Sequence, residues 1–506
     1  MAELTSIRER VKAKPADALV QAYYRQSVPR ALEQAFTHEM QVHLAHAVML
    51  AEREIVSRAS IARILHAVLD LAEAGPTALD VDYSQEDLYS YVERHLIAAI
   101  GSEDGGRLHT GRSRNDLNVT TWRMALRQAL IEAMEALCTL RQSLLARAEA
   151  HAETVMPGYT HSQHAQPITF GYYCEAAAAI LARDFVRLEG ALAHVDLCPL
   201  GAGALATTGF PIDRQMTARL LGFRGLVENA YDAVSSRDDI HEAASALAVC
   251  MTNVSRVAVD LQAWSMREHG FIELGDAYSS VSSIMPQKKN PQALEHTKAA
   301  AGTVAGALVA ALSMSKNTSL SDTNDGVTAP NKPVMEAASV TRDALLLMAG
   351  VVDTLTVHER TMLQAAEDGF GTATELADVI VRATGLPFRT AHGIVARTVS
   401  AALARGLRAA EITADDIAAA SEGITEERVL LDPATVAEAL DAARNIHVRT
   451  VSGGPAPELV RAAARRGAER LSADRQKMQD VRDRIEKART QLQQKVEGLL
   501  AASGTD

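Results

Sequence analysis

The chain has 506 residues, a formal net charge of −12, and 47% hydrophobic but only 4% aromatic residues. This length is enough for two or three domains with a large core, and a composition rich in Ala and Leu favours helices over sheets. The negative charge, without a basic stripe interleaved with aromatic residues, argues against a nucleic-acid-binding protein. The first residues lack the apolar core of a signal peptide, and no uninterrupted apolar run is long enough to cross a bilayer. We therefore expect a cytoplasmic protein that is not bound to membranes.

Residues 1–112 are expected to form an N-terminal helical domain. Apolar residues recur at helical spacing between Val42 and Ala51. Ser84, with Asp87 three residues later, predicts a capping box at the start of a helix that ends near Ile100. The turn-rich stretch that follows Ile100 closes this domain.

Residues 113–360 are expected to form a central domain of long helices. From Asp116 onwards apolar residues recur every three or four positions, which predicts a long helix that ends before Pro157. Similar patterns follow at residues 168–195, 239–268, 291–315 and 333–352. Five long helices in antiparallel succession predict a bundle, and their wide apolar faces predict packing against other subunits.

Residues 361–506 are expected to form a C-terminal domain of shorter helices with Gly and Pro breaks, followed by an extra helix at about 470–500. Five apolar residues recur there every seven positions: Leu471, Met478, Ile485, Leu492 and Leu499. The spacing is typical of a coiled coil or of a helix docked on a surface. Asp474 and Lys495 interrupt the apolar seam and weaken the coiled-coil interpretation. A helix folded onto its own domain fits equally well.

The sequence gives no reason to expect a cofactor, a metal ion or disulfide bonds. Its four cysteines are widely separated in helical contexts, which is typical of reduced core residues in a cytosolic protein. These are Cys138, Cys174, Cys198 and Cys250. No pair of histidines, including His161 with His164, has a spacing typical of a metal site. Gly201-Ala202-Gly203 follows no strand, so it does not predict a nucleotide-binding turn.

The stretch from Ser282 to Pro291 carries the strongest chemical signal in the sequence. It is too irregular for a helix, and Pro291 is expected to be the first residue of the helix that follows. A serine-rich loop at a helix N-terminus suits an anion, because the backbone N–H groups there are free. Lys288 adds a positive charge that suits a carboxylate, or a serine that must lose its proton. The alternative interpretation is a surface loop with solvated lysines.

Two further stretches strengthen the functional interpretation, Leu108–Asp116 and Met156–Pro167. Together with the serine-rich loop, which we place at about residues 276–290, they resemble the three signature regions of the fumarase/aspartase superfamily. The resemblance is closest to its argininosuccinate lyase branch and covers roughly residues 40 to 460. It implies an all-α fold of three domains, whose central long-helix bundle forms the core of a homotetramer. It also implies that each active site is built from three subunits.

The resemblance implies a carbon–nitrogen lyase that releases fumarate from a succinyl group by β-elimination. Ser282 matches the catalytic serine of the family and is the expected base, with Lys288 beside it. His161 is expected to pair with Glu295, which orients the imidazole as an acid for the departing nitrogen. The family usually has Gly before its serine pair, whereas this chain has Val281, which could change how the loop closes.

The succinyl carboxylates are expected to be held by residues from all three signature regions. Arg114 presents a planar fork that matches a carboxylate, and Arg237 is a second candidate that an ion pair with Asp238 would explain equally well. The complete set of expected substrate-binding residues is Ser113, Arg114, Asn115, Thr160, Arg237, Ser283, Met285 and Asn290, with Lys288 of the catalytic group.

The leaving amine is expected to differ from arginine. The family's arginine site uses a Tyr, a Gln and a Lys after the catalytic loop, but residues 321–332 offer no Tyr or Gln there. The Asn-Ala-Ser and Asp pattern that grips the arginine head is also absent from residues 25–34. The overall resemblance, including the long C-terminal tail, is to a member of the family that cleaves an aminopolycarboxylate. It implies an N-substituted aspartate as the dicarboxylate substrate, with ethylenediamine-N,N'-disuccinate as the first choice. Argininosuccinate cleavage, or a non-catalytic relative like the lens crystallins, are the alternatives.

Overall fold

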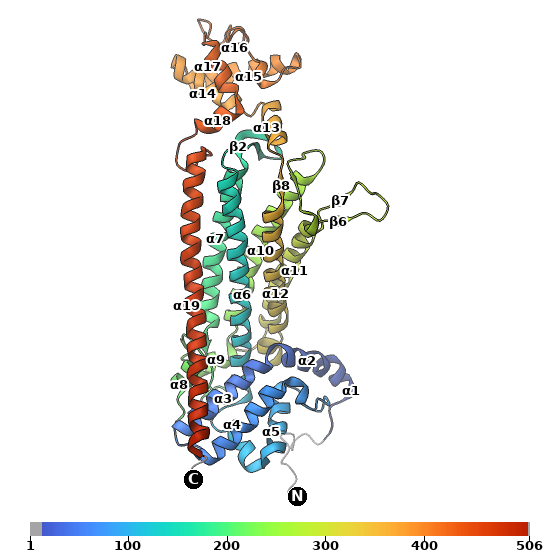
Figure 1. Cartoon of the computed structure of the whole chain (residues 1–506), viewed down its shortest axis with the longest axis vertical. Coiled ribbons are helices and arrows are strands. Elements are labelled where there is room, and N and C mark those ends of the chain that lie inside the picture. Colours follow the sequence, from blue (N-terminus) through green and yellow to red (C-terminus); the bar gives the residue numbers. More distant parts are fainter. Residues whose placement is uncertain (1–12, 504–506) are drawn as a thin grey trace.

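The computed structural model describes residues 13–503. Long helices run side by side along the molecule, with a group of helices at each end of this bundle (Figure 1). The first residues of the chain, on which the expectation of no signal peptide rests, lie outside the described residues.

The N-terminal domain packs short and medium helices around one apolar core. After a π-helical turn at Val20–Tyr24, its main helices are α2 (Arg25–Gln34), α3 (Phe36–Glu52), α4 (Arg58–Ala74) and α5 (Leu88–Gly105), preceded by α1 (Asp17–Leu19). The expected capping box is wrong, because Asp87 and not Ser84 is the N-cap of α5. The Asp87 carboxylate accepts a hydrogen bond from the backbone N–H of Ser90 at 2.9 Å. The helix ends near Ile100 as predicted, because Gly101 has a non-helical φ of 82°, and a short second helical segment then continues to Gly105.

The central bundle contains all five long helices that the periodicity predicted. They are α6 (Arg114–Ala150), α7 (Phe170–Val195), α10 (Asp238–Ser265), α11 (Gln292–Ser315) and α12 (Asn331–Thr354), with α8 (Arg214–Leu220) and α9 (Ala230–Ser235) as short connections. A capping box between Ser113 and Asp116 starts α6, and its apolar stripe, which includes Leu130 and Leu137, lies in the largest core. Pro291 is the N-cap of α11, so the helix begins at Gln292, one residue later than predicted.

Short β-hairpins and bridges interrupt a fold that was expected to be all-helical. The strands are β1 (Val155–Thr160) with β2 (Gln163–Thr169), β3 (Leu197–Cys198) with β4 (Gly225–Leu226), β5 (Ile272–Glu273) with β8 (Thr356–Val357), and β6 (Ser280–Val281) with β7 (Lys289–Asn290). The fold class remains mostly helical. Two of these hairpins, β1–β2 and β6–β7, carry the segments that the sequence marked as catalytic.

The C-terminal domain has its own small core at the far end of the bundle (Figure 1). Its helices are α13 (Glu359–Asp368), α14 (Ala373–Thr384), α15 (Phe388–Ala404), α16 (Ala414–Ser421), α17 (Pro433–Leu440) and α18 (Ala442–His447). The chain then returns along the entire bundle as α19 (Pro457–Ser503), a helix of 47 residues.

Helix α19 docks on the other two domains of its own chain. Leu471 and Met478 enter the core of the central bundle, and Leu492 and Leu499 enter the core of the N-terminal domain. The helix begins well before residue 470, and the expectation that it could fold onto its own domain is wrong. The charges in its seam are paired, because Asp474 lies 2.7 Å from Arg141 and Lys495 lies 2.7 Å from Glu52.

Two helices, α10 and α11, are long and apolar enough by length and composition to cross a membrane. Both pack against other helices of the bundle, α10 against α7, α11 and α12, and α11 against α12. All four cysteines are buried and unpaired, and burial raises the pKa of the Cys174 thiol to about 12. Between residues 13 and 503, no group of three or more potential metal-binding side chains is found.

Candidate active site

The catalytic loop predicted around Ser282 is a hairpin that projects from the side of the bundle (Figure 1). Strands β6 and β7 pair at its base, where Ser280 faces Asn290 and Val281 faces Lys289. Lys289 ties the base to the preceding segment, because its Nζ lies 2.8 Å from Glu273 and 2.7 Å from Asp276. The base of the hairpin is thus anchored and its tip reaches away from the chain.

The hydroxyl of Ser282 faces two backbone N–H groups. The N–H of Met285 donates to Ser282 Oγ at 3.0 Å, and that of Ile284 at 3.3 Å. Two N–H donors aimed at one oxygen stabilise negative charge on that oxygen, which a serine base requires. Ser283, Met285 and Lys288 are exposed around it, and no described ion pair engages Lys288.

The tip of this hairpin exposes apolar side chains to an unusual degree. Val281 is 87% exposed and Ile284 is 83% exposed. Apolar residues on a protruding loop are typical of a surface that meets another molecule. Val281, the departure from the family pattern, is therefore part of this exposed surface.

The histidine motif lies at the opposite end of the bundle from the N-terminal domain. Thr160 ends β1, and His161 and Ser162 form the turn to β2 with φ angles of 53° and 59°. This left-handed turn holds the exposed His161 side chain at the tip of the hairpin. Glu295 lies in the first turn of α11 and is also exposed. No described contact within one chain joins His161 to Glu295, so the predicted pair does not form there.

The carboxylate-binding segment begins α6, next to the N-terminal domain. Arg114 forms ion pairs with Glu86 and with Asp87, the latter at 3.1 Å. The Asn115 side chain donates to the carbonyl of Ala204 at 3.3 Å. Ser113 was predicted to bind substrate, but its hydroxyl caps α6 by accepting from the N–H of Asn115.

The carboxylate of Asp116 holds the turn at Gly201–Gly203, to which the sequence analysis gave no function. This carboxylate accepts hydrogen bonds from the N–H groups of Gly201 at 2.8 Å and Gly203 at 2.9 Å, and also from Ser113. The turn therefore fixes the start of α6, where Arg114 stands.

Arg237 is buried and available for an anion. It is 5% exposed, its Nη2 donates to Asn331 at 2.7 Å, and its Nε and Nη1 have no partner among the described residues. The alternative of an ion pair with Asp238 is wrong, because two guanidinium nitrogens of Arg237 have no partner and the third donates to Asn331. Burial lowers the pKa of the Arg237 guanidinium.

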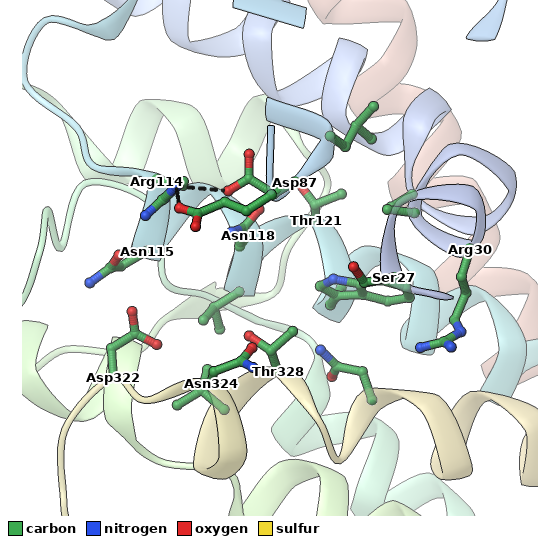
Figure 2. A pocket seen from close by; sticks show the side chains of 18 of the residues that line it. Ser27, Arg30, Asp87, Arg114, Asn115, Asn118, Thr121, Asp322, Asn324 and Thr328 are labelled. Carbon is green, nitrogen blue, oxygen red and sulfur yellow. Dashed lines mark hydrogen bonds and ion pairs between the residues drawn. The ribbon is translucent and has the colours of Figure 1, made fainter. Parts of the chain in front are cut away.

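Arg114, Asn115 and Arg237 line one cavity of about 440 Å³. Its wall combines helices of the N-terminal domain, the start of α6 and the segment around residues 322–331 (Figure 2). The sequence reasoning missed most of its other polar residues, namely Ser27, Arg30, Asn118, Thr121, Asn324 and Thr328. Asn118 and Thr121 follow Arg114 at helical spacing on α6, a signal that could have found them.

The three predicted groups of site residues are far apart within one chain (Figure 1). His161 lies at the C-terminal-domain end of the bundle, the Ser282 hairpin lies at its side, and the cavity with Arg114 lies at the N-terminal-domain end. One chain alone therefore does not bring the predicted base, acid and anion-binding residues together.

Comparison with known proteins gives the family. Residues 11–306 match a lyase family model, and residues 370–446 match the argininosuccinate lyase C-terminal model. The chain is 40% identical over 479 residues to argininosuccinate lyase 1 of Shouchella clausii, covering 95% of this chain and 96% of that protein. It is also 40% identical to argininosuccinate lyase of Methanosarcina acetivorans over 95% of this chain and 96% of that protein. This chain belongs to the argininosuccinate lyase family.

Among solved structures, the fold matches an EDDS lyase in complex with formate. The TM-score is 0.88 at 33% sequence identity, and 97% of each chain is covered. A 3-carboxy-cis,cis-muconate lactonizing enzyme from Pseudomonas putida, at 20% identity and a TM-score of 0.71, shares the fold alone. The protein is accordingly a fumarate-releasing C–N lyase of the argininosuccinate lyase family, and the mostly helical superfamily fold predicted from its motifs is confirmed.

Proposed function

We propose that this enzyme acts in the cytoplasm and reversibly eliminates fumarate from an N-substituted aspartate, with Ser282 as the base. The Cβ proton of a succinyl group is weakly acidic, so the base must contact it directly. The neighbouring carboxylate gains negative charge in the transition state, and fixed donors must meet that charge. The two N–H groups on Ser282 Oγ support the oxyanion form of the base, and Lys288 adds a positive charge in the same loop.

The proposed acid is His161, oriented by Glu295 of another subunit. Thr160, Ser283 and Asn290 would donate to the succinyl carboxylates, and Met285 would cover the succinyl group. In one chain Thr160 and His161 lie on one hairpin, Ser283 and Met285 lie on another, and all four are exposed, which supports a site completed by assembly.

We propose a homotetramer with composite sites. The helices that would form its core expose large apolar side chains, among them Val249 and Val259 on α10, Val309 and Leu312 on α11, and Leu346 on α12. The test mixes two inactive variants, Ser282→Ala and His161→Asn, after dissociation in urea and reassembly. Activity should return in the mixture, because some sites then contain both native residues. A mixture as inactive as its parents would refute composite sites.

The leaving amine is proposed to come from ethylenediamine-N,N'-disuccinate. The observation that carries this choice is Arg30, which lines the cavity and forms no ion pair with any described residue. Figure 2 shows Arg30 and Arg114 at opposite ends of the group of side chains drawn. Arg114 is paired with Glu86 and Asp87, whereas Arg30 has no carboxylate partner, so a substrate with a second dicarboxylate can place it against Arg30.

Argininosuccinate is the second candidate substrate. It is favoured by the curated relatives at 40–42% identity, which are argininosuccinate lyases. Against it, residues 321–332 contain no Tyr or Gln, and the spacing puts Asp322, Val327 and Pro330 where the family has its arginine-binding residues. An arginine head without these partners would leave polar groups unpaired, at about 1–3 kcal/mol each.

The test compares kcat/KM for the two substrates in one buffer, followed by the absorbance of fumarate. We expect the higher value for ethylenediamine-N,N'-disuccinate. Arg30→Gln should lower that value about tenfold or more, because a hydrogen bond to a charged group contributes about 1.5–3 kcal/mol. The matched control is Arg25→Gln on the same helix, since Arg25 stacks on Tyr83 outside the cavity. An equal or higher value for argininosuccinate would overturn the choice, and no fumarate from either would favour a non-catalytic relative.

A further inference from the structure

Glu39 is a buried carboxyl at the floor of the cavity. It lies on α3, is 1% exposed, and lines the cavity together with buried Tyr24 and Thr121. Its Oε1 is buried and receives no hydrogen bond from any described residue. An unsatisfied polar group costs free energy when it is buried, so a carboxyl in the cavity wall that has no hydrogen-bond partner is suited to a cationic ligand.

His43 faces this carboxyl but forms no hydrogen bond with it. Arg112 Nη2 lies 2.9 Å from His43 Nδ1, and because a guanidinium can only donate, Nδ1 must accept. Burial, followed by the charge of Arg112, lowers the pKa of His43 well below its ordinary value, so the ring is neutral and its hydrogen is on Nε2. His43 Nε2 faces Glu39 Oε1 at 3.4 Å, too far for a strong hydrogen bond.

Burial favours the protonated form of the Glu39 carboxyl by raising its pKa. Burial, followed by Asp87 at the start of α5, raises the pKa of the Glu39 carboxyl to about 8, whereas Arg112 lowers it. The other titratable groups near Arg112 are the carboxyl groups of Asp116 and Glu93 and the side chains of His46, His109 and Tyr89. Burial lowers the pKa of both histidines and raises that of the tyrosine. A cation bound against Glu39 would lower the pKa of this carboxyl and favour its ionised form.

We propose that Glu39 recognises the protonated nitrogen of the leaving amine and loses its own proton when that cation binds. The proton goes to solvent, and the carboxylate then accepts a hydrogen bond from the ammonium or guanidinium group. Glu86 and Asp87 are already paired with Arg114. Asp322 also lines the cavity but is exposed, which leaves Glu39 as the buried acidic group that can respond to the amine. This inference rests on the proposed function, because it assigns the amine half of the substrate to this cavity.

The test counts protons during amine binding. Ethylenediamine and, separately, arginine are titrated into the wild type and into Glu39→Gln by calorimetry, in two buffers with different ionisation enthalpies. The ionisation of the amine itself is common to both proteins, so the difference in proton count belongs to Glu39. We expect the wild type to release up to about one additional proton per site at pH 7, and almost none at pH 9. Relative to Glu39→Gln, its Kd should tighten about tenfold per pH unit between pH 6 and pH 8.

The matched control is Glu52→Gln, at the other end of α3 and outside the cavity, which should behave like the wild type. Equal proton counts in the wild type and Glu39→Gln would overturn the proposal, as would failure of both amines to bind. If Glu39→Gln does not fold, the wild type alone tests the proposal. Proton release that falls between pH 7 and pH 9 would support it, and release that stays constant would overturn it. The proposed function is tested separately by the fumarate assay. A protein that binds the amines but releases no fumarate would contradict the proposed function without deciding the role of Glu39.

Discussion

The buried ion pair between α19 and the bundle should dominate the docking of this helix. Asp474→Ala removes one partner and leaves Arg141, which is 1% exposed, without its carboxylate. Arg141 Nη1 donates to Asp474 at 2.7 Å, and its Nε already lacks a hydrogen bond partner. Removing one partner of a buried pair costs about 3–5 kcal/mol, because the remaining charge stays desolvated. We expect a loss of unfolding free energy in that range.

The chain offers a matched control across the same two helices. Arg482 of α19 and Glu135 of α6 form a two-pronged ion pair, but both side chains are about 40% exposed. Water screens an exposed pair, so Glu135→Ala should cost less than about 1 kcal/mol. Replacing both buried partners by apolar residues, Arg141→Met with Asp474→Leu, should recover most of the loss of the single variant.

The assay is urea unfolding followed by circular dichroism at fixed protein concentration, comparing midpoints at a common slope. If Asp474→Ala shifted the midpoint no more than Glu135→Ala, the buried pair would contribute no more than a surface pair, and the reasoning from burial would be refuted.

Two further predictions concern the catalytic loop. Ser282→Ala should lower kcat at least about a hundredfold without loss of fold, because it removes the proposed base. The control Ser283→Ala should lower kcat less. Turnover by Ser282→Ala above about a tenth of wild type would contradict the role of Ser282. Gly350→Ala on α12 should lower kcat with little unfolding, because its new methyl group would collide with the hydroxyl of Tyr278, just before the loop. The control Gly393→Ala on α15, in the C-terminal domain, meets no atom within 4 Å and should be neutral or slightly stabilising.

The sequence predicted the helices of this protein because their determinants are local. An apolar stripe at helical spacing and a capping box at Ser113 and Asp116 define α6 from neighbouring residues alone. The loop around Ser282 could likewise be located, since its irregular composition and the following Pro291 are visible in the sequence. The motif around His161 was found, but its hairpin was not, because two left-handed residues in a turn carry no clear signal when neither is Gly or Asn.

The tertiary structure decided which side chains meet. Arg30, Arg114 and Arg237 are separated by long stretches of sequence, and only folding places them on one cavity. The sequence left Arg237 between an anion site and an ion pair with Asp238, and burial with two unpartnered nitrogens decided against the ion pair.

The seven-residue repeat of α19 also separates what the sequence determines from what the tertiary structure determines. The repeat determined that a helix would bury one face, since Leu471 and Leu492 fall on the same side. It did not determine what covers that face, because a stripe of this width fits a partner helix, a second subunit or the protein's own domains equally well. The partner was decided by contacts distant in sequence, with Arg141 supplying the charge that Asp474 needs once it is buried. Periodicity therefore determines that a surface is buried, and tertiary packing determines against what.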